Sequence, residues 1–109
     1  MSKWTDNPRE FKKISDISTQ VVGMAIVEVT LESGMILEGA IRNISMGNNA
    51  SSALRDGHWL YYGNFDIEML DGQRINIDMC DVKSVRNLWQ QKSKIYEDVG
   101  IIKIISDGL

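Results

Sequence analysis

The chain has 109 residues, 43% of them hydrophobic and 25% charged, a composition typical of a globular protein, and we expect one domain spanning residues 1–109. Its net charge of -3 argues against a broad basic face for double-stranded DNA or an anionic membrane, since such binding depends on clustered Lys and Arg. Cys80 is the single cysteine, which excludes an intrachain disulfide framework.

The first predicted element is a helix over residues 8–20. Asn7 is a typical N-cap, Pro8 suits the first helical position, and Glu10 is placed to complete a capping box. Four apolar residues recur at helical spacing and predict one buried face: Phe11, Ile14, Ile17 and Val21.

The next segment, residues 24–44, alternates apolar and polar residues and predicts a β-hairpin. A three-residue loop, Glu32-Ser33-Gly34, with glycine in the left-handed conformation, sets Val29 opposite Leu37 and Val27 opposite Gly39. One apolar face results. The other face places Glu28 opposite Glu38, a like-charge pair that is unfavourable unless a cation lies nearby.

A second hairpin is predicted around Asp71-Gly72. A two-residue turn would oppose Phe65 with Asp78 and mix apolar and charged residues on one face, so we reject that register. The three-residue loop Leu70-Asp71-Gly72 instead gives a consistent apolar face and a favourable charge pair. Its predicted pairs are Ile67 with Ile75, Phe65 with Ile77, Gly63 with Met79 and Glu68 with Arg74.

Aromatic residues are densest in "HWLYYG", residues 58–63, just before this hairpin. The strand phase places Trp59 and Tyr61 on the apolar face, where we expect them to join the core. His58 and Tyr62 point the other way, and they are the better ligand-binding residues, although exposed surface positions would show the same pattern.

The remaining segments are a polar, flexible loop over residues 45–57, a short turn or last barrel strand over residues 81–87, a second helix and an apolar tail. The second helix is indicated by Leu88, Lys92, Ile95 and Val99 at helical spacing, with Gly100 as its stop. The tail, residues 101–105, predicts a final strand that pairs within the chain or with a second subunit. The fold class is therefore α+β: an N-terminal helix, a strongly bent antiparallel sheet or small barrel, a C-terminal helix and a short final strand.

Catalytic and metal-binding patterns are not visible in the chain. One His and one Cys are too few for a zinc site unless carboxylates or a second subunit complete it, and there is no nucleophile elbow or phosphate-binding glycine loop. Asp66, Asp78 and Asp81 alternate along strands, as a solvated polar face would. We therefore expect a non-enzymatic protein without a metal or cofactor. No signal peptide or bilayer-length apolar stretch is present either, and a cytoplasmic location is expected.

The helix followed by "VEVTLESGMILEGAIRNI" resembles the opening of Sm-like proteins, small bent barrels that assemble into rings and bind RNA. The matching positions are Val27, Val29, Leu31, Gly34 and Gly39. Asn49 takes the position of a family Asn, whereas Met46 stands near the position of a family Asp. Val85, Arg86 and Asn87 partly match the second family motif, an apolar residue followed by Arg-Gly.

Three functional hypotheses follow from these patterns. The preferred one is a non-enzymatic binding or assembly module that forms a homo-oligomer. The resemblance implies a second, RNA binding, with Asn49 and Arg86 contacting a base and His58 or Tyr62 stacking on it. The third is a small-molecule site beside the 45–57 loop, lined by Met46, Trp59 and Tyr61, with an acidic residue that selects a cation.

Overall fold

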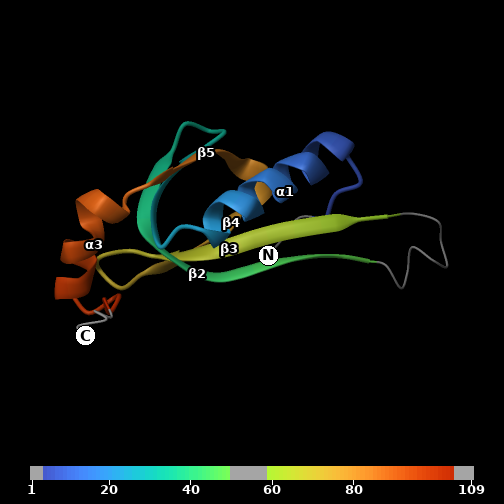
Figure 1. Ribbon diagram of the computed structural model, residues 1–109. Helices are drawn as coiled ribbons and strands as arrows, with labels where there is room; N and C mark the ends of the chain where they lie inside the picture. The colour runs from blue at the N-terminus through green and yellow to red at the C-terminus, as the bar shows by residue number, and fades with distance from the viewer. Residues whose placement is uncertain (1–3, 50–58, 105–109) are drawn as a thin grey trace.

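The structure is a computed structural model that describes residues 4–49 and 59–104. A long helix lies across a bent five-stranded antiparallel sheet, and a second helix follows the last strand (Figure 1). The elements are α1 (Pro8–Val22), β1 (Ile26–Leu31), β2 (Ile36–Asn48), β3 (Tyr61–Glu68), β4 (Arg74–Asp78), the 3₁₀ turn η1 (Met79–Asp81), β5 (Val82–Asn87) and α3 (Trp89–Asp98). The predicted α+β class is confirmed. No helix within the described ranges is long and apolar enough to span a membrane.

Helix α1 begins at the predicted residue and ends two residues later than predicted. The side chain of Asn7 accepts a hydrogen bond from the Arg9 N–H, as an N-cap does. The capping box takes a different form: the Asn7 N–H donates to Thr5 Oγ1, and the Thr5 hydroxyl donates to Glu10 Oε1 at 2.6 Å. Thr5 therefore stands between the two residues that the sequence pattern paired directly.

The first hairpin has the predicted register. Val27 lies opposite Gly39 and Val29 opposite Leu37, and Gly34 has a positive φ of 92°. Only glycine adopts this conformation without strain, which is why the loop closes at that position. The register was predictable because loop length and the apolar alternation agree on it.

The like-charge pair in this hairpin is present and is neutralised by two cations. Glu28 lies opposite Glu38 in the ladder. Arg86 Nη2 lies 3.1 Å from Glu28 Oε2, and Lys92 Nζ lies 3.8 Å from Glu38 Oε1. Each carboxylate thus has its own positive partner, which offsets the repulsion between them.

The second hairpin also has the predicted register, with Phe65 opposite Ile77, Ile67 opposite Ile75 and Glu68 opposite Arg74. Its ladder ends at Asn64 and Asp78, one pair short of the predicted Gly63–Met79 pair, because Met79 begins η1. Gly63 and Met79 remain close: a Cβ on Gly63 would lie 2.8 Å from Met79 Sδ.

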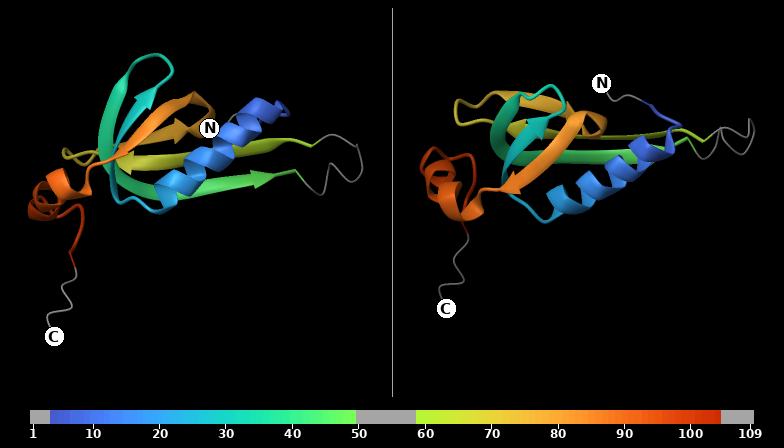
Figure 2. Two further views of the ribbon diagram at one scale, coloured as in Figure 1. Left: turned by 45° about the horizontal axis from the view of Figure 1, so that its top comes forward. Right: turned by 90° about the horizontal axis from the view of Figure 1, so that it is seen from above.

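The strand order is β4-β3-β2-β1-β5, and the predicted last barrel strand is therefore β5, which pairs with β1. The inner face of the sheet and the buried side of α1 enclose the main core (Figure 2). Its largest fully buried side chains include Phe65, Ile14, Ile67, Met79 and Val29. Phe11, predicted to share this buried face, is exposed and packs against Tyr61 instead.

Three predictions outside the hairpins need correction. Residues 45–48 of the predicted loop belong to β2, because they pair with β3; residues 50–58 of that loop lie outside the described residues. On α3 the buried residue is Tyr96, while Ile95 and Val99 are exposed. Residues 101–104 of the predicted final strand form no strand, and Ile101 and Ile102 instead pack against a small cluster of Ile26, Ala40, Leu88 and Tyr96.

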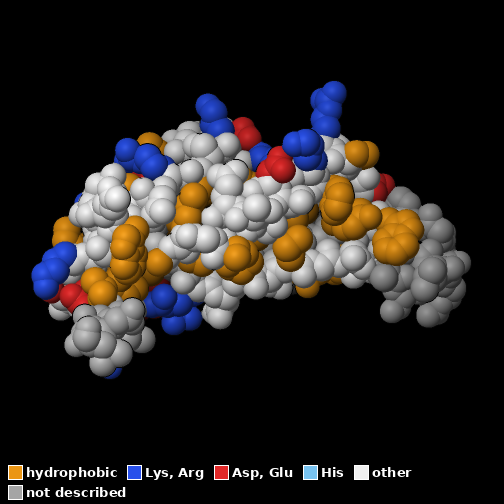
Figure 3. Space-filling view, in the orientation of Figure 1, with side chains coloured by type: hydrophobic (Ala, Val, Ile, Leu, Met, Phe, Trp, Pro, Cys, Tyr) orange, Lys and Arg blue, Asp and Glu red, His pale blue; other side chains and the backbone are white. Residues whose placement is uncertain are grey.

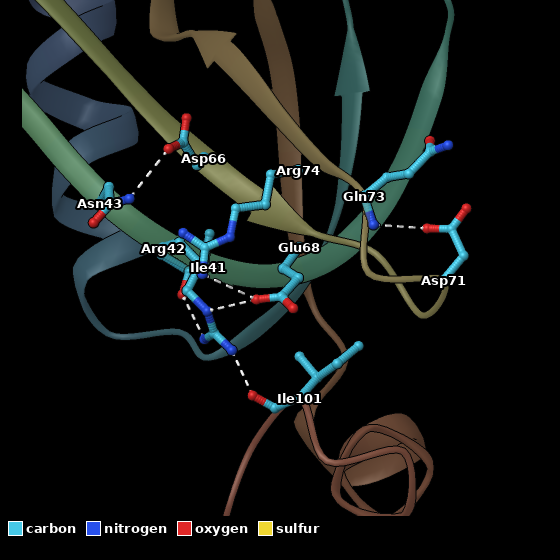
Figure 4. Close-up of polar contacts among 9 residues, drawn as sticks. All are labelled: Ile41, Arg42, Asn43, Asp66, Glu68, Asp71, Gln73, Arg74 and Ile101. Atoms are coloured by element: carbon cyan, nitrogen blue, oxygen red, sulfur yellow. Dashed lines mark hydrogen bonds and ion pairs between the residues drawn. The ribbon is translucent and has the colours of Figure 1, made fainter.

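Arg42 joins this C-terminal segment to the sheet (Figure 4). Its Nε lies 3.1 Å from Glu68 Oε1, and its Nη2 donates to the carbonyl oxygen of Ile101. On the solvent side, Arg74 Nη2 lies 3.4 Å from the same Glu68 oxygen. One half-buried guanidinium therefore connects β2, β3 and the chain after α3.

Candidate functional site: an aromatic pocket on the β2–β3 ribbon

Strands β2 and β3 continue past the bent sheet as a two-stranded ribbon, which is the long projection in Figure 2. Strand β1 pairs with β2 through Ala40, whereas β3 pairs with β2 as far as Asn48. The register shifts between Arg42 and Ser45, where Asn43 has a positive φ of 39°. This bulge separates the part of β2 that pairs with β1 from the part that pairs with the start of β3. We call residues 45–48 and 61–64 the β2–β3 ribbon.

A cavity of about 350 Å³ lies between the start of α1 and the β2–β3 ribbon. We call it the aromatic pocket. It is lined by Phe11, Ile14, Met46, Gly47, Asn48, Tyr61 and Tyr62. The ladder pairs Asn48 with Tyr61 and Gly47 with Tyr62, so neighbouring lining residues come from both strands.

Two aromatic pairs lie on the β2–β3 ribbon, one on each face, because neighbouring side chains of a strand point to opposite faces. The rings of Phe11 and Tyr61 lie 4.1 Å apart between centroids at an interplanar angle of 40°. Those of Trp4 and Tyr62 lie 4.7 Å apart at 56°. Such tilted pairs are favourable because the edge of one ring meets the face of the other. Each pair connects the N-terminal part of the chain to β3.

Gly47 gives the Tyr62 ring its place on the ribbon. A Cβ at position 47 would lie 2.9 Å from Tyr62 Cε1 and 3.0 Å from its hydroxyl oxygen. The ring therefore lies directly over the glycine backbone, a close approach that a side chain would prevent.

Hydrogen bonds from the Asn49 side chain and between main-chain groups hold the far end of the β2–β3 ribbon. The Leu60 N–H donates to Asn49 Oδ1 at 2.7 Å, and the Asn49 N–H donates to the Leu60 carbonyl at 3.2 Å. On the other edge of β3, Thr5 and Tyr61 exchange two main-chain hydrogen bonds of 2.8 Å. Asn49 and Thr5 thus position Tyr61 and Tyr62 from both sides.

The structure brings only some of the predicted site residues together. Met46, Tyr61 and Tyr62 come together in the aromatic pocket, whereas His58 lies outside the described residues. Trp59, predicted to be a core and pocket residue, is 45% exposed and is not among the lining residues. Tyr62 is half-buried, and its side chain lies on the face of β3 opposite that of Tyr61, as the strand phase predicted.

Arg86 lies far from the aromatic pocket. It pairs with Glu28, which lies opposite Glu38 near the start of β2, while Asn49 follows the end of that strand. At about 3.3 Å per residue, Glu38 and Asn49 are separated by roughly 35 Å measured along the bent strand β2. One chain therefore does not bring these two predicted base contacts together.

Sequence reasoning missed Phe11 and Gly47 as site residues. Phe11 was assigned to the buried helix face by its spacing, and only the position of the β2–β3 ribbon shows that it reaches Tyr61. Gly47 was placed in a loop. The sequence pattern that could have placed Gly47 in a strand is the short stretch from Met46 to Asn48, and three residues are too few to predict a strand.

A second feature is the pair of open sheet edges. Among the described strands, β4 pairs only with β3, and β5 pairs only with β1. An apolar cleft of about 190 Å³ lies beside β4, and we call it the β4 cleft. Its lining residues are Leu31, Met35, Leu37, Ile75, Asn76, Ile77, Asp78 and Asp81.

Comparisons with known proteins support the fold. No family model matches the chain, and no curated protein matches its sequence. Among solved structures, it is similar to a Xanthomonas campestris protein whose crystal structure adopts a novel variant of the Sm-like motif. That similarity has a TM-score of 0.62 at 12% identity and covers 80% of this chain and 94% of the other. The protein therefore has a small bent sheet whose fold is similar to an Sm-like motif.

Proposed function

We propose that this protein is a non-enzymatic binding module that assembles into a homo-oligomer through its sheet edges. The observation that supports this most directly is that both outer strands of the sheet, β4 and β5, have one strand partner each among the described residues. An exposed edge presents main-chain N–H and C=O groups that a further strand can pair with.

The alternation of hydrogen bonds shows which groups are presented. The Met69 N–H donates to the Gln73 carbonyl, so the main-chain groups of Arg74 and Asn76 point away from β3. On β5, the Leu88 N–H donates to the Ile26 carbonyl, so those of Val85 point away from β1. Both edges can therefore extend the sheet.

The two edges are also complementary in charge. The β4 cleft carries Asp78 and Asp81, whereas β5 carries exposed Lys83 and Arg86. Pairing β4 of one copy with β5 of the next would bring opposite charges together and cover the apolar lining of the cleft. Such a head-to-tail contact closes into a ring when the rotation between copies permits it.

The test is solution mass by light scattering on the full chain and two variants. Met35→Lys places a charge in the β4 cleft at a side chain that is 57% exposed, and Val22→Lys makes the same change at a 71% exposed position at the end of α1. We expect an oligomeric parent, dissociation by Met35→Lys and no change with Val22→Lys. A monomeric parent, or the same oligomer in both variants, would refute the assembly.

A further inference from the structure

We propose that the aromatic pocket binds a small, neutral, planar heteroaromatic molecule. This inference goes beyond assembly, because no residue lining the aromatic pocket also lines the β4 cleft. It rests on three properties of the pocket: its ring-lined shape, its lack of charge and its position at the surface.

The shape favours a flat ligand. The Phe11 and Tyr61 rings form one wall, the Met46 side chain lies beside them, and main-chain atoms of Gly47 and Tyr62 complete the lining, because the Tyr62 ring points to the opposite face of the ribbon. Aromatic faces and a thioether sulfur make their best contacts with another ring. The volume of about 350 Å³ lies at the small end of the range for ligand sites.

The chemistry favours a neutral ligand. None of the described residues that line the pocket carries a formal charge at neutral pH. A charged ligand would lose hydration there without gaining an ionic partner, whereas a neutral ring gains apolar contact. The polar groups of the lining residues on this face, the phenol of Tyr61 and the amide of Asn48, suit a ring that carries one N–H or carbonyl group. The acidic residue expected to select a cation is therefore not part of this lining.

The position favours access from solvent. Met46 is 49% exposed and Phe11 is also exposed, so the lining reaches the surface. Figure 3 shows hydrophobic side chains spaced across the face that it displays, below several Lys and Arg side chains. Apolar side chains gathered at the surface beside a cavity are typical of a binding site.

The experiment uses indole as the neutral planar probe and indole-3-carboxylate as its matched anion. Each is titrated into the ¹⁵N-labelled full chain, and amide chemical shifts are followed. For a nine-atom ring we expect saturable binding of indole with a dissociation constant of about 1 mM, shifting the amides of Gly47, Tyr61 and Tyr62. The carboxylate should bind at least about tenfold more weakly.

Two methionine variants locate the site. Met46→Ala removes a lining side chain and should weaken indole binding about three- to tenfold, whereas Met35→Ala, at another exposed methionine in the β4 cleft, should leave it unchanged. Both positions are at the surface, so the amide spectrum should keep its native dispersion. The proposal is overturned by an absence of saturable indole binding, by equal affinity for the anion, or by equal affinity in the two variants.

Discussion

At the residue scale, Tyr96 shows how one polar contact selects the buried side of a helix. Its side chain is 1% exposed, and its phenol donates a hydrogen bond to Glu38 Oε2 at 3.0 Å. Burial, that hydrogen bond and the negative charge of Glu38 all favour the neutral phenol and hold the pKa of Tyr96 well above its ordinary value of 10.0. Tyr96 therefore docks α3 with a satisfied hydroxyl, whereas Ile95 and Val99 remain at the surface.

This contact predicts a loss of stability in alkali. Since the pKa of Tyr96 is higher in the folded chain than in the unfolded chain, folding retains a proton that the unfolded chain releases above about pH 10. The stability contributed by Tyr96 is complete below that pH and falls as the pH rises above it. Urea denaturation of the parent and Tyr96→Phe from about pH 8 to pH 11 should show the steeper decline in the parent.

The Tyr96→Phe comparison also controls for other groups that titrate in alkali, since both proteins contain the same lysines. At neutral pH the variant should lose about 1.5–3 kcal/mol, the usual net value of a hydrogen bond to a charged group. Parallel pH profiles in the two proteins would show that the Glu38 contact does not perturb Tyr96.

At the scale of elements, Gly39 allows β2 and β3 to approach where the sheet bends. A Cβ at position 39 would lie 2.9 Å from the Glu68 carbonyl oxygen and 2.9 Å from Ile67 Cβ. The first of these atoms belongs to the backbone and has little room to move. The close approach of the two strands therefore requires glycine at this position. Backbone conformation does not, because the φ of Gly39 is not positive.

Gly39→Ala should therefore destabilise the protein by about 1–3 kcal/mol, as overpacking a rigid site does. Gly23→Ala is the matched control, because the nearest atom to its new Cβ lies at 3.8 Å and φ is an ordinary -90°. That change should alter stability by no more than about 0.5 kcal/mol. Urea denaturation measures both, and an equally small effect at position 39 would mean that the strands separate at little cost.

The hairpins and the aromatic pocket differ in how far they could be predicted. Both hairpin registers follow from a glycine at the third loop position together with apolar alternation, which are local features. The pocket was predicted only in part, through Met46 and Tyr61. Its Phe11 wall depends on where α1 crosses the ribbon, and no spacing within one segment specifies that crossing.

At the scale of the whole molecule, the segment after α3 is held by its own chain. Ile101 and Ile102 pack beside Leu88 and Tyr96, and the Ile101 carbonyl accepts a hydrogen bond from Arg42. Of the two predicted roles for the tail, contact within the chain therefore explains the positions of Ile101 and Ile102. In the proposed oligomer, the subunit contact lies at β4 and β5 instead.

Arg42→Gln should destabilise the protein by about 1–3 kcal/mol, because it removes a half-buried charged donor and leaves Glu68 partly uncompensated. Arg74→Gln is the matched control: it contacts the same Glu68 oxygen from an exposed position and should cost no more than about 0.5 kcal/mol. Hydrogen exchange should also show faster exchange at Ile101 and Ile102 in Arg42→Gln alone. Equal losses in the two variants would contradict a special role for Arg42.

The sequence by itself determined the features whose causes are local: the start of α1 at Asn7 and Pro8, both hairpin registers, and the opposed pair of Glu28 and Glu38. Only the tertiary structure decided that Trp59 is exposed, that Tyr96 is the buried residue of α3, and that Arg86 lies far from Asn49. Loop conformation, capping and alternation act over a few neighbouring residues. Which face of an element is buried depends on the distant element that packs against it. The buried position of Tyr96 on α3, for example, depends on Glu38 in β2, which accepts its hydrogen bond.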